Sequence, residues 1–513
     1  MSATEERNYV EAARREKRAE LEKLGVAAFA FRFERTHTAA EALAAYDDAA
    51  GEAGPEVRVA GRISAFRSKG KTAFAHIEDS SGRIQLYFRQ DALKESYARL
   101  DLLDLDDHIG AQGRLFRTKT GEVTVRVEAF ELLAKSLRPL PRGKTYVRED
   151  GTTGDTALAD PEVRYRQRYA DLAVHAEVRE VFRLRARTIA YLRRFLDERE
   201  FLEVETPILQ PLYGGAAARP FVTHHNTLDM PLYLRIADEL YLKRLLVGGL
   251  ERVYEIGHDF RNEGIDRTHF PEFTMLEFYQ AYADYHDMME TVEAMIAGVV
   301  QEVTGSLRLE RGGVTLDFKR PWPRVSFVDG IREHTGLDVR TASENDLRRF
   351  LAPIWADHRA AHGDDPDASK PIPLSGGKLL DEVFKVALEP HLVQPTFVVD
   401  YPKALSPLAR LHRRDPALTE RFELFVQGVE LANAFSELID PDDQRARFDQ
   451  QGRERAAGDE EAQRFDADYV RALEYGMPPA GGVGVGVDRL VMLVTGQPSI
   501  RDVILFPAMR PEA

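Results

Sequence analysis

A carboxylate flanked by aromatic rings is the first feature of this sequence that could do chemistry. Phe273, Glu277 and Tyr279 fall on one face of a predicted strand over residues 272–281. A buried charge needs a partner, so Glu277 and Tyr279 together could bind a cationic substrate group. Phe273 could stack on a purine, and Arg261, at the mouth of the same predicted hairpin, offers a planar fork suited to phosphate or carboxylate. Taken alone, the pattern slightly favours a sheet with a buried ion pair between Glu277 and an arginine.

A second pair of carboxylates, Glu423 and Glu430, flanks a predicted two-residue turn at Gln427-Gly428. This turn places Phe425 opposite Glu430 and Glu423 opposite Ala432. The two carboxylates then become diagonal neighbours on one face, with Cβ atoms about 7–8 Å apart. They repel each other unless a cation bridges them, and hard oxygen ligands suit Mg²⁺ carried by phosphates.

Two further polar residues of the same strand, Asn433 and Glu437, are in phase with each other but out of phase with Glu430. Because side chains alternate between the faces of a strand, all of them can line one pocket only if a bulge or strong twist occurs near Ala432.

Near the C-terminus, glycine alternates with valine over residues 482–487, directly before Asp488 and Arg489. Glycines on one face of a strand allow a ligand to approach the backbone closely. Arg489, at the start of a following helix, could cover an adenine by cation–π stacking. The plainer interpretation is a glycine-rich strand that packs tightly against a helix.

The strands that carry these residues are often adjacent in sequence, which suggests an α+β domain with an antiparallel sheet flanked by helices, expected over residues 162–513. Its first helix is predicted from apolar residues at helical spacing between Val178 and Leu196, followed by a strand-like segment, Phe201–Thr206. The hairpins described above supply the sheet.

A smaller β domain is expected over residues 51–137, after a helical extension over residues 1–50 and before a linker over residues 138–161. Five predicted strands with one helix between the third and fourth are typical of an OB-fold barrel, with strands over 57–66, 72–78, 83–88, 110–118 and 122–133. Phe74 among surrounding cations would suit single-stranded nucleic acid, because bases stack and phosphates need counter-charge. A core position for Phe74, with ordinary surface cations around it, is equally compatible with the pattern.

The composition excludes several classes of protein. There is no cysteine among the 513 residues, which removes disulfides, thiolate zinc sites, thiol nucleophiles and iron–sulfur clusters. A formal net charge of −15 argues against a partner held only by bulk attraction to phosphate, although local basic patches remain possible. The longest apolar runs are far shorter than the roughly 18 residues of a membrane helix, and the N-terminus lacks the order of a secretory signal. We therefore expect a cytoplasmic protein without a membrane span.

Over nearly its whole length the chain resembles the class II aminoacyl-tRNA synthetases, and in detail the bacterial lysyl-tRNA synthetases. The three class motifs resemble residues 195–209, residues 260–264 joined to 271–277, and residues 484–489. Four further segments resemble the lysine-specific members, namely residues 214–216, 219–226, 234–240 and 433–437. The resemblance implies an enzyme that joins lysine to tRNA(Lys) through lysyl-adenylate, as a homodimer, with ATP as substrate and up to three Mg²⁺ ions per active site.

The family's site residues carry over to matching positions of this sequence. Arg261 and Arg489 would be catalytic. The implied lysine ligands are Gly215, Glu239, Arg261, Glu277, Tyr279, Asn433 and Glu437. The implied ATP ligands are Arg261, Glu263, His269, Phe270, Phe273, Glu423 and Arg489. Glu423 and Glu430 would bind Mg²⁺, and the anticodon would be read by Arg67, Phe74, Gln85 and Glu122.

The chain departs from the family pattern beside the second motif. Phe270 stands where the family commonly has asparagine beside adenine, and His258, Asp259 and Thr268 replace other familiar polar or basic residues. If backbone groups meet adenine there, Phe270 is harmless, whereas recognition by a side chain would be altered.

Three alternatives remain open at this point. The chain could activate aspartate or asparagine on the same fold, although carboxylates rather than arginines in the side-chain pocket argue against this. It could lysylate a protein, although those relatives lack the barrel. It could also be an OB-type RNA-binding protein with an inactive second domain, which the intact set of charged residues makes improbable.

Overall fold

The computed structural model describes residues 3–49, 54–147, 153–361, 376–456 and 464–511. The chain forms two compact units, which are treated separately below. The first comprises residues 1–160 and 169–174, and the second comprises residues 161–168 and 175–513. No helix in the described ranges is long and apolar enough to cross a membrane.

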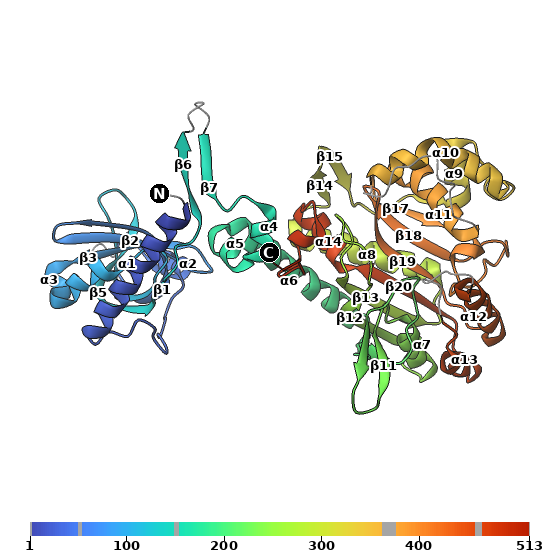
Figure 1. Cartoon of the computed structure of the whole chain (residues 1–513), viewed down its shortest axis with the longest axis horizontal. Coiled ribbons are helices and arrows are strands. Elements are labelled where there is room, and N and C mark those ends of the chain that lie inside the picture. Colours follow the sequence, from blue (N-terminus) through green and yellow to red (C-terminus); the bar gives the residue numbers. More distant parts are fainter. Residues whose placement is uncertain (1–2, 50–53, 148–152, 362–375, 457–463, 512–513) are drawn as a thin grey trace. The chain divides into compact units, whose positions relative to one another are not determined.

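The first unit contains a β-barrel (Figure 1). The barrel is closed and has five strands in the order β1-β2-β3-β5-β4. Its strands are β1 (Glu56–Lys69), β2 (Thr72–Glu78), β3 (Arg83–Arg89), β4 (His108–Arg117) and β5 (Val123–Ala134). Between β3 and β4 lie the short helix α3 (Gln90–Leu93) and the 3₁₀ segment η2 (Lys94–Leu102). The predicted OB-fold barrel is therefore confirmed.

Alternation of side chains explains the barrel interior. In β2, Ala73, Ala75 and Ile77 are buried while the residues between them are half-buried, as a strand with one core face requires. Helices α1 (Ala3–Lys23) and α2 (Ala39–Ala45) precede the barrel, and Thr38 caps α2 by accepting a hydrogen bond from the Glu41 amide. The expected linker contains a two-stranded sheet, β6 (Arg142–Val147) with β7 (Thr153–Ala157).

The second unit is built on an eight-stranded mixed sheet with the order β16-β17-β18-β19-β20-β13-β12-β8. All neighbours pair antiparallel except β16 with β17 and β12 with β8. Its strands are β8 (Leu202–Glu203), β12 (Arg252–Phe260), β13 (Glu272–Ala281), β16 (Arg324–Ser326), β17 (Thr396–Val399), β18 (Arg421–Val426), β19 (Val429–Ser436) and β20 (Ala480–Gly486). The predicted α+β class is confirmed, and the two predicted hairpins are the pairs β12–β13 and β18–β19.

Small sheets complete the second unit. One has the order β10-β11-β9, from β9 (Leu209–Gln210), β10 (Val222–His225) and β11 (Met230–Leu234). The other pairs β14 (Arg308–Arg311) with β15 (Val314–Asp317).

Helices cover the large sheet and enclose its main core (Figure 1). This core gathers apolar side chains of α6 (Ala176–Asp197), α8 (Tyr285–Thr304) and α14 (Val487–Thr495) against β13, β19 and β20. The remaining helical segments of the second unit are α4 (Pro161–Arg166), α7 (Glu239–Val247), α9 (Phe327–Thr335), α10 (Glu344–Ala361), α11 (Gly376–Ala387), η3 (Glu389–His391), η4 (Lys403–Leu405), α12 (Pro441–Ala456), α13 (Ala467–Glu474) and η5 (Ile500–Asp502). Helix α5 (Arg168–Val174), apart from its first residue, belongs to the first unit.

Asp488, buried at the start of α14, fixes this helix to the sheet. Its carboxylate accepts hydrogen bonds from the Thr274 amide at 2.7 Å and from Arg185 Nη1 at 2.5 Å. Arg185 also donates to the Thr274 hydroxyl at 2.8 Å. Arg489, the next residue, is thereby held beside β13, where the sequence predicts the nucleotide site.

Candidate active site

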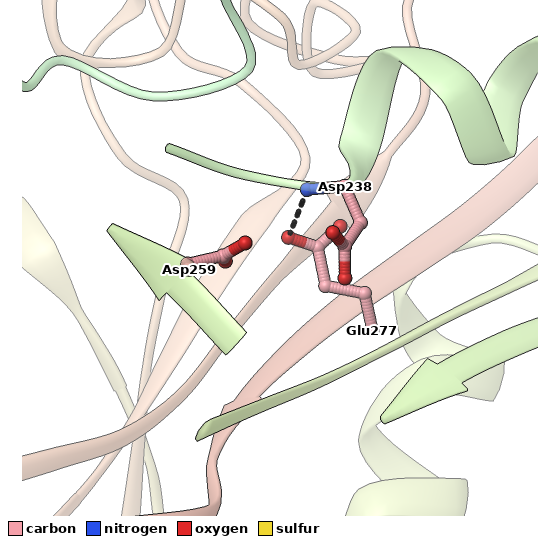
Figure 2. Close-up of side chains that lie close together, drawn as sticks. All are labelled: Asp238, Asp259 and Glu277. Atoms are coloured by element: carbon pink, nitrogen blue, oxygen red, sulfur yellow. Dashed lines mark hydrogen bonds between the residues drawn. The ribbon is translucent and has the colours of Figure 1, made fainter. Parts of the chain in front are cut away.

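Glu277 lies in the middle of β13 and is almost completely buried. Figure 2 shows its carboxylate beside the start of α7, where the Asp238 amide donates to Oε1 at 3.3 Å. The Tyr279 hydroxyl donates to Oε2 at 2.9 Å. Burial raises the pKa of Glu277 to about 8, and the charges of Asp259 and Glu239 act in the same direction. A buried carboxylate of this kind gains stability when a cation reaches it.

Three carboxylates, those of Asp238, Asp259 and Glu277, lie close enough together to hold a cation (Figure 2). Asp238 and Asp259 form ion pairs with the buried guanidinium of Arg235, at 2.8 and 3.3 Å. Glu255 also pairs with Arg235, at 2.5 Å. Burial raises the pKa of Asp259 to about 6, and the charge of Glu255 acts in the same direction against the opposing charges of Arg235 and Arg261. This cluster thus contains more negative charge than its resident arginine neutralises.

Glu437 follows β19 and lies close to Tyr279 because the strand between them carries a glycine. A Cβ on Gly482 would lie 2.5 Å from Cδ1 of Tyr279 and closer still to Oε1 of Glu437. At Gly482 the missing side chain thus leaves room for Tyr279 and Glu437. The sequence pattern instead suggested that these glycines allow a ligand to approach the backbone. Burial raises the pKa of Glu437 to about 8, as it does for Glu277.

Glu239, at the first turn of α7, is buried beside Gly215. Gly215 has a φ of +91°, and a Cβ there would lie 3.2 Å from Cβ of Glu239. The structure therefore brings together these two predicted ligands of the lysine α-amino group. Lys243, one turn further along α7, forms ion pairs with both Glu239 and Glu437.

Arg261 packs over the Phe273 ring, with its Cζ 5.1 Å from the ring centroid. Its Nε is buried and makes no hydrogen bond to any residue in the described ranges. An unsatisfied buried donor is costly, so this guanidinium is suited to receive a phosphate or carboxylate oxygen.

Arg489 is held by the loop between β12 and β13. Its Nη2 lies 3.0 Å from Nε2 of His269, and its Nη1 lies 3.2 Å from Oε2 of Glu430. His269 in turn lies 2.8 Å from Asp266 through Nδ1. Because arginine only donates, Nε2 of His269 is the acceptor and Nδ1 carries the proton. The predicted nucleotide residues Arg489 and His269 are therefore in direct contact.

The hairpin β18–β19 contains the bulge that the sequence required. Phe425 pairs with Glu430 as predicted, but the register shifts at Leu431, so that Glu423 pairs with Asn433. The predicted pairing of Glu423 with Ala432 is therefore wrong, because one extra residue is inserted in β19. The bulge brings Asn433 onto the face that carries Glu423 and Glu430.

Arg421 and Tyr401 orient Glu423. Arg421 Nη2 donates to Oε1 of Glu423 at 2.6 Å, and the Tyr401 hydroxyl donates to Oε2 at 2.8 Å. Arg421 Nε also donates to Oδ1 of Asn433, at 3.0 Å. Burial and the nearby charge of Glu430 raise the pKa of Glu423 to about 7. Each carboxylate oxygen of Glu423 retains a free lone pair after its hydrogen bond, so the Glu423–Glu430 pair fits a divalent cation.

Two other predicted ATP ligands have different surroundings. Glu263 is exposed in the loop between β12 and β13. The Phe270 ring is only 6% exposed and packs in the main core.

In the barrel, Phe74 lies on the outer face of β2, half-buried, and stacks on Tyr87 at a centroid distance of 4.6 Å. Arg67 pairs with Phe74 across β1 and β2. The Gln85 side chain donates to Glu122 at 2.8 Å. These contacts favour the aromatic-platform interpretation over a core position for Phe74.

Several residues of these sites were not predicted from the sequence, namely Lys243, Arg235, Arg421, Tyr401, Asp238, Asp266 and Tyr87, together with His76, whose Nε2 lies 2.8 Å from Oε1 of Glu122. A signal existed for Lys243, which follows Glu239 at the i+4 spacing of a helical ion pair. The others contact the site only through the tertiary fold.

Comparisons with known proteins agree with this architecture. Residues 160–510 match the family "tRNA synthetases class II (D, K and N)", and residues 57–133 match the "OB-fold nucleic acid binding domain". The lysine–tRNA ligase of Carboxydothermus hydrogenoformans is 52% identical over 508 residues, covering 99% of both chains. The lysine–tRNA ligase of Roseiflexus castenholzii is 54% identical over 499 residues, covering 96% of this chain and 97% of that protein. The chain therefore belongs to the lysine–tRNA ligase family of class II aminoacyl-tRNA synthetases.

Proposed function

We propose that the chain activates L-lysine with ATP, forming lysyl-adenylate and pyrophosphate, and then transfers lysine to the 3′ end of tRNA(Lys). The observation that carries this proposal is the convergence of Glu239, Glu277 and Glu437 in one buried pocket, where burial raises the pKa of each carboxyl group. Such a pocket favours a substrate with two ammonium groups. Relatives named lysine–tRNA ligase over the full length support the same conclusion.

Different residues around the pocket would bind different groups of the substrate. Glu277 and Glu437 would hold the ε-ammonium, with the Tyr279 hydroxyl fixing Glu277. Glu239 and the backbone of Gly215 would receive the α-amino group. Asn433 and Arg261 would bind the lysine carboxylate, which leaves a carboxylate oxygen directed toward ATP.

ATP would bind over the loop between β12 and β13, with adenine between Phe273 and Arg489. Arg261 would bridge the lysine carboxylate and the α-phosphate, and His269 and Glu263 would contact the nucleotide from the loop. At Phe270 the backbone would contact adenine, since the ring packs in the core.

Glu423 and Glu430 would hold Mg²⁺ brought by the phosphates of ATP, with up to three ions per site. When bound, Mg²⁺ neutralises phosphate charge. The protein's own contribution is to hold Glu423 through Arg421 and Tyr401 before the nucleotide arrives.

The chemistry requires no enzyme nucleophile. An oxygen of the lysine carboxylate attacks the α-phosphorus, and the bond to pyrophosphate breaks, giving lysyl-adenylate. The terminal ribose 3′-hydroxyl of tRNA then attacks the lysyl carbonyl, and AMP leaves. Arg261 and Arg489 assist by positioning the reactants and by neutralising charge that develops on the phosphate.

The barrel would bind the anticodon through Arg67, Phe74, Gln85 and Glu122. A stacked aromatic pair on the outer face of the barrel, Phe74 with Tyr87, is the feature that supports this role. The proposed domains of the chain are a helical extension (1–50), an anticodon-binding domain (51–137), a linker (138–161) and a catalytic domain (162–513).

A homodimer working in the cytoplasm, where charged tRNA is used by ribosomes, completes the proposal. Strand β8 lies at the edge of the large sheet, and apolar residues in and after it are exposed, namely Leu202, Ile208, Leu209, Val222 and Leu228. Exposed apolar groups around a sheet edge are characteristic of an interaction surface. Light scattering should give about twice the chain mass of 58.0 kDa, and a monomer at micromolar concentration would contradict the dimer.

The direct test of the function is ATP–pyrophosphate exchange with purified protein, Mg²⁺ and each amino acid in turn, without tRNA. Exchange with lysine alone is the expected result. Exchange with aspartate or asparagine would retain the fold and overturn the substrate. The absence of exchange with every amino acid would instead support the alternative of an RNA-binding protein with an inactive domain.

A further inference from the structure

We infer that Lys243 is a positioning residue for lysine selectivity, whose buried ammonium holds Glu239 and Glu437 in place and sets the charge of the pocket to match a substrate with two ammonium groups. The inference rests on the proposed function, because it assigns Glu239 and Glu437 to the α-amino and ε-ammonium groups of lysine.

The location of Lys243 is the first support. Its side chain is completely buried on α7, with Nζ 2.5 Å from Oε1 of Glu239 and also paired with Oε2 of Glu437. Glu239 belongs to α7, whereas Glu437 follows β19, so one ammonium joins two elements that are far apart in the sequence. Among the residues that the structure describes, Lys243 is the only cation in ion-pair contact with Glu437.

The surroundings of Lys243 leave it no route to solvent. The Phe435 ring lies 5.2 Å from Nζ, and the hydroxyl of Tyr469 is buried nearby. An ion pair in such a site is fixed in geometry, because its partners cannot exchange with water. The two carboxylates are therefore oriented before lysine enters.

Charge balance is the second support. The groups assigned to the two amino groups of lysine comprise three carboxyl groups, Glu239, Glu277 and Glu437, and one resident ammonium, Lys243. Two of these carboxyl groups therefore have no resident ammonium, and burial raises the pKa of Glu277 and Glu437. The Asp238–Asp259–Arg235 cluster beside Glu277 adds no net positive charge. Bound lysine supplies its two ammonium groups, while its carboxylate is directed to Arg261. Among these four groups, the two ammonium groups of lysine match the two carboxyl groups that lack a resident partner, and loss of Lys243 would leave one more buried carboxyl group without a counter-charge.

Lys243 also opposes protonation of its partners. Burial raises the pKa of Glu437 and of Glu239, and in both cases the charge of Lys243 is the largest influence that lowers it. Removing this ammonium raises both values further, so more of the pocket is neutral at pH 7 and attracts an ammonium substrate less strongly. The ionisable groups that face Lys243 and its two partners are Glu277, Tyr279, Tyr469 and Arg421.

The test compares Lys243→Met with Arg244→Met in pyrophosphate exchange. Arg244 is the next residue of α7, and it pairs with Asp466 at 2.9 Å outside the pocket. For Lys243→Met we expect the lysine KM to rise at least 30-fold, while the ATP KM changes less than threefold and the rate at saturating lysine falls less than tenfold. The lysine KM should fall as pH rises and the carboxyl groups ionise. In Lys243→Met the midpoint of this fall should lie at least one pH unit above that of wild type. Arg244→Met should leave the lysine KM within threefold of wild type.

A chemical rescue separates positioning from folding. The chain has no cysteine, so Lys243→Cys can be aminoethylated at this position alone in denaturant and then refolded, which restores an ammonium at the length of a lysine side chain. Wild-type protein taken through the same unfolding and refolding is the control. Lysine KM should be high before modification and return to within fivefold of wild type afterward, with mass spectrometry giving the modified fraction.

Two results would overturn the inference: a lysine KM in Lys243→Met equal to wild type, or equal rises in lysine and ATP KM that aminoethylation of Lys243→Cys does not reverse. Wild-type protein that shows no lysine-dependent exchange would instead refute the proposed function.

Discussion

Gly482 offers a sharp test of the pocket geometry, because it separates Glu437 from Tyr279. In Gly482→Ala the new methyl group would lie 2.5 Å from Cδ1 of Tyr279, whereas ordinary carbon contacts are about 3.5–4.0 Å. Neither neighbour can yield easily, since Tyr279 is buried with its hydroxyl on Glu277 and Glu437 is paired with Lys243. A displacement of about 1 Å in the ammonium site is therefore expected.

Displacements of this size at a reacting site can reduce rates by about 10²-fold, and overpacking costs about 1–3 kcal/mol of stability. We expect Gly482→Ala to reduce kcat/KM for lysine about 100-fold in pyrophosphate exchange, with a much smaller change in the KM for ATP. Thermal unfolding measures the stability loss separately.

Gly484→Ala is the matched control in the same strand. Its methyl group would lie 3.2 Å from Cε of Met275, the flexible end of a side chain, and 3.9 Å from Cγ of Glu277. The KM for lysine should change less than threefold in this control. The reasoning is refuted if the two variants show the same lysine KM, or if Gly482→Ala impairs ATP and lysine binding equally.

Four further outcomes follow from substitutions in the active site and the barrel. Because burial raises the pKa of Glu277 from an ordinary value of 4.5 to about 8, its contribution to the free energy of unfolding is fully present below about pH 4.5 and is lost as pH rises through about 8; Glu277→Gln should flatten this part of the stability–pH curve. The same variant should lose exchange with lysine and gain little with other amino acids, and retained lysine turnover would contradict the assignment. Arg261→Ala should reduce exchange at least 100-fold with little change in unfolding temperature, and near-normal exchange would refute its catalytic role. Phe74→Ala should raise the KM for tRNA about tenfold in aminoacylation and leave pyrophosphate exchange unchanged, because a lost base stack is worth about 1–3 kcal/mol; an unchanged tRNA KM would exclude Phe74 from the anticodon site.

The sequence alone predicted the elements of the site because their signals are local. Alternation placed Glu277 and Tyr279 on one face of β13, and a two-residue turn at Gln427-Gly428 gave the pairing of Phe425 with Glu430. The barrel followed from strand lengths and turn residues. The family resemblance rested on long motifs in a fixed order, which can be recognised in one sequence without knowledge of the structure.

Only the tertiary structure decided which charges neutralise one another. The bulge at Leu431 brings Asn433 opposite Glu423. The phase of Glu430 and Asn433 in the sequence shows that they need a bulge near Ala432 to share a face, but whether it forms depends on the register between two strands. The pairing of Lys243 with Glu437 joins a helix to the end of a distant strand, and burial of the Phe270 ring depends on the core beneath it. Periodicity shows which face a side chain occupies, whereas packing of separate elements determines its partners, because electrostatic contacts depend on distance in space rather than in sequence.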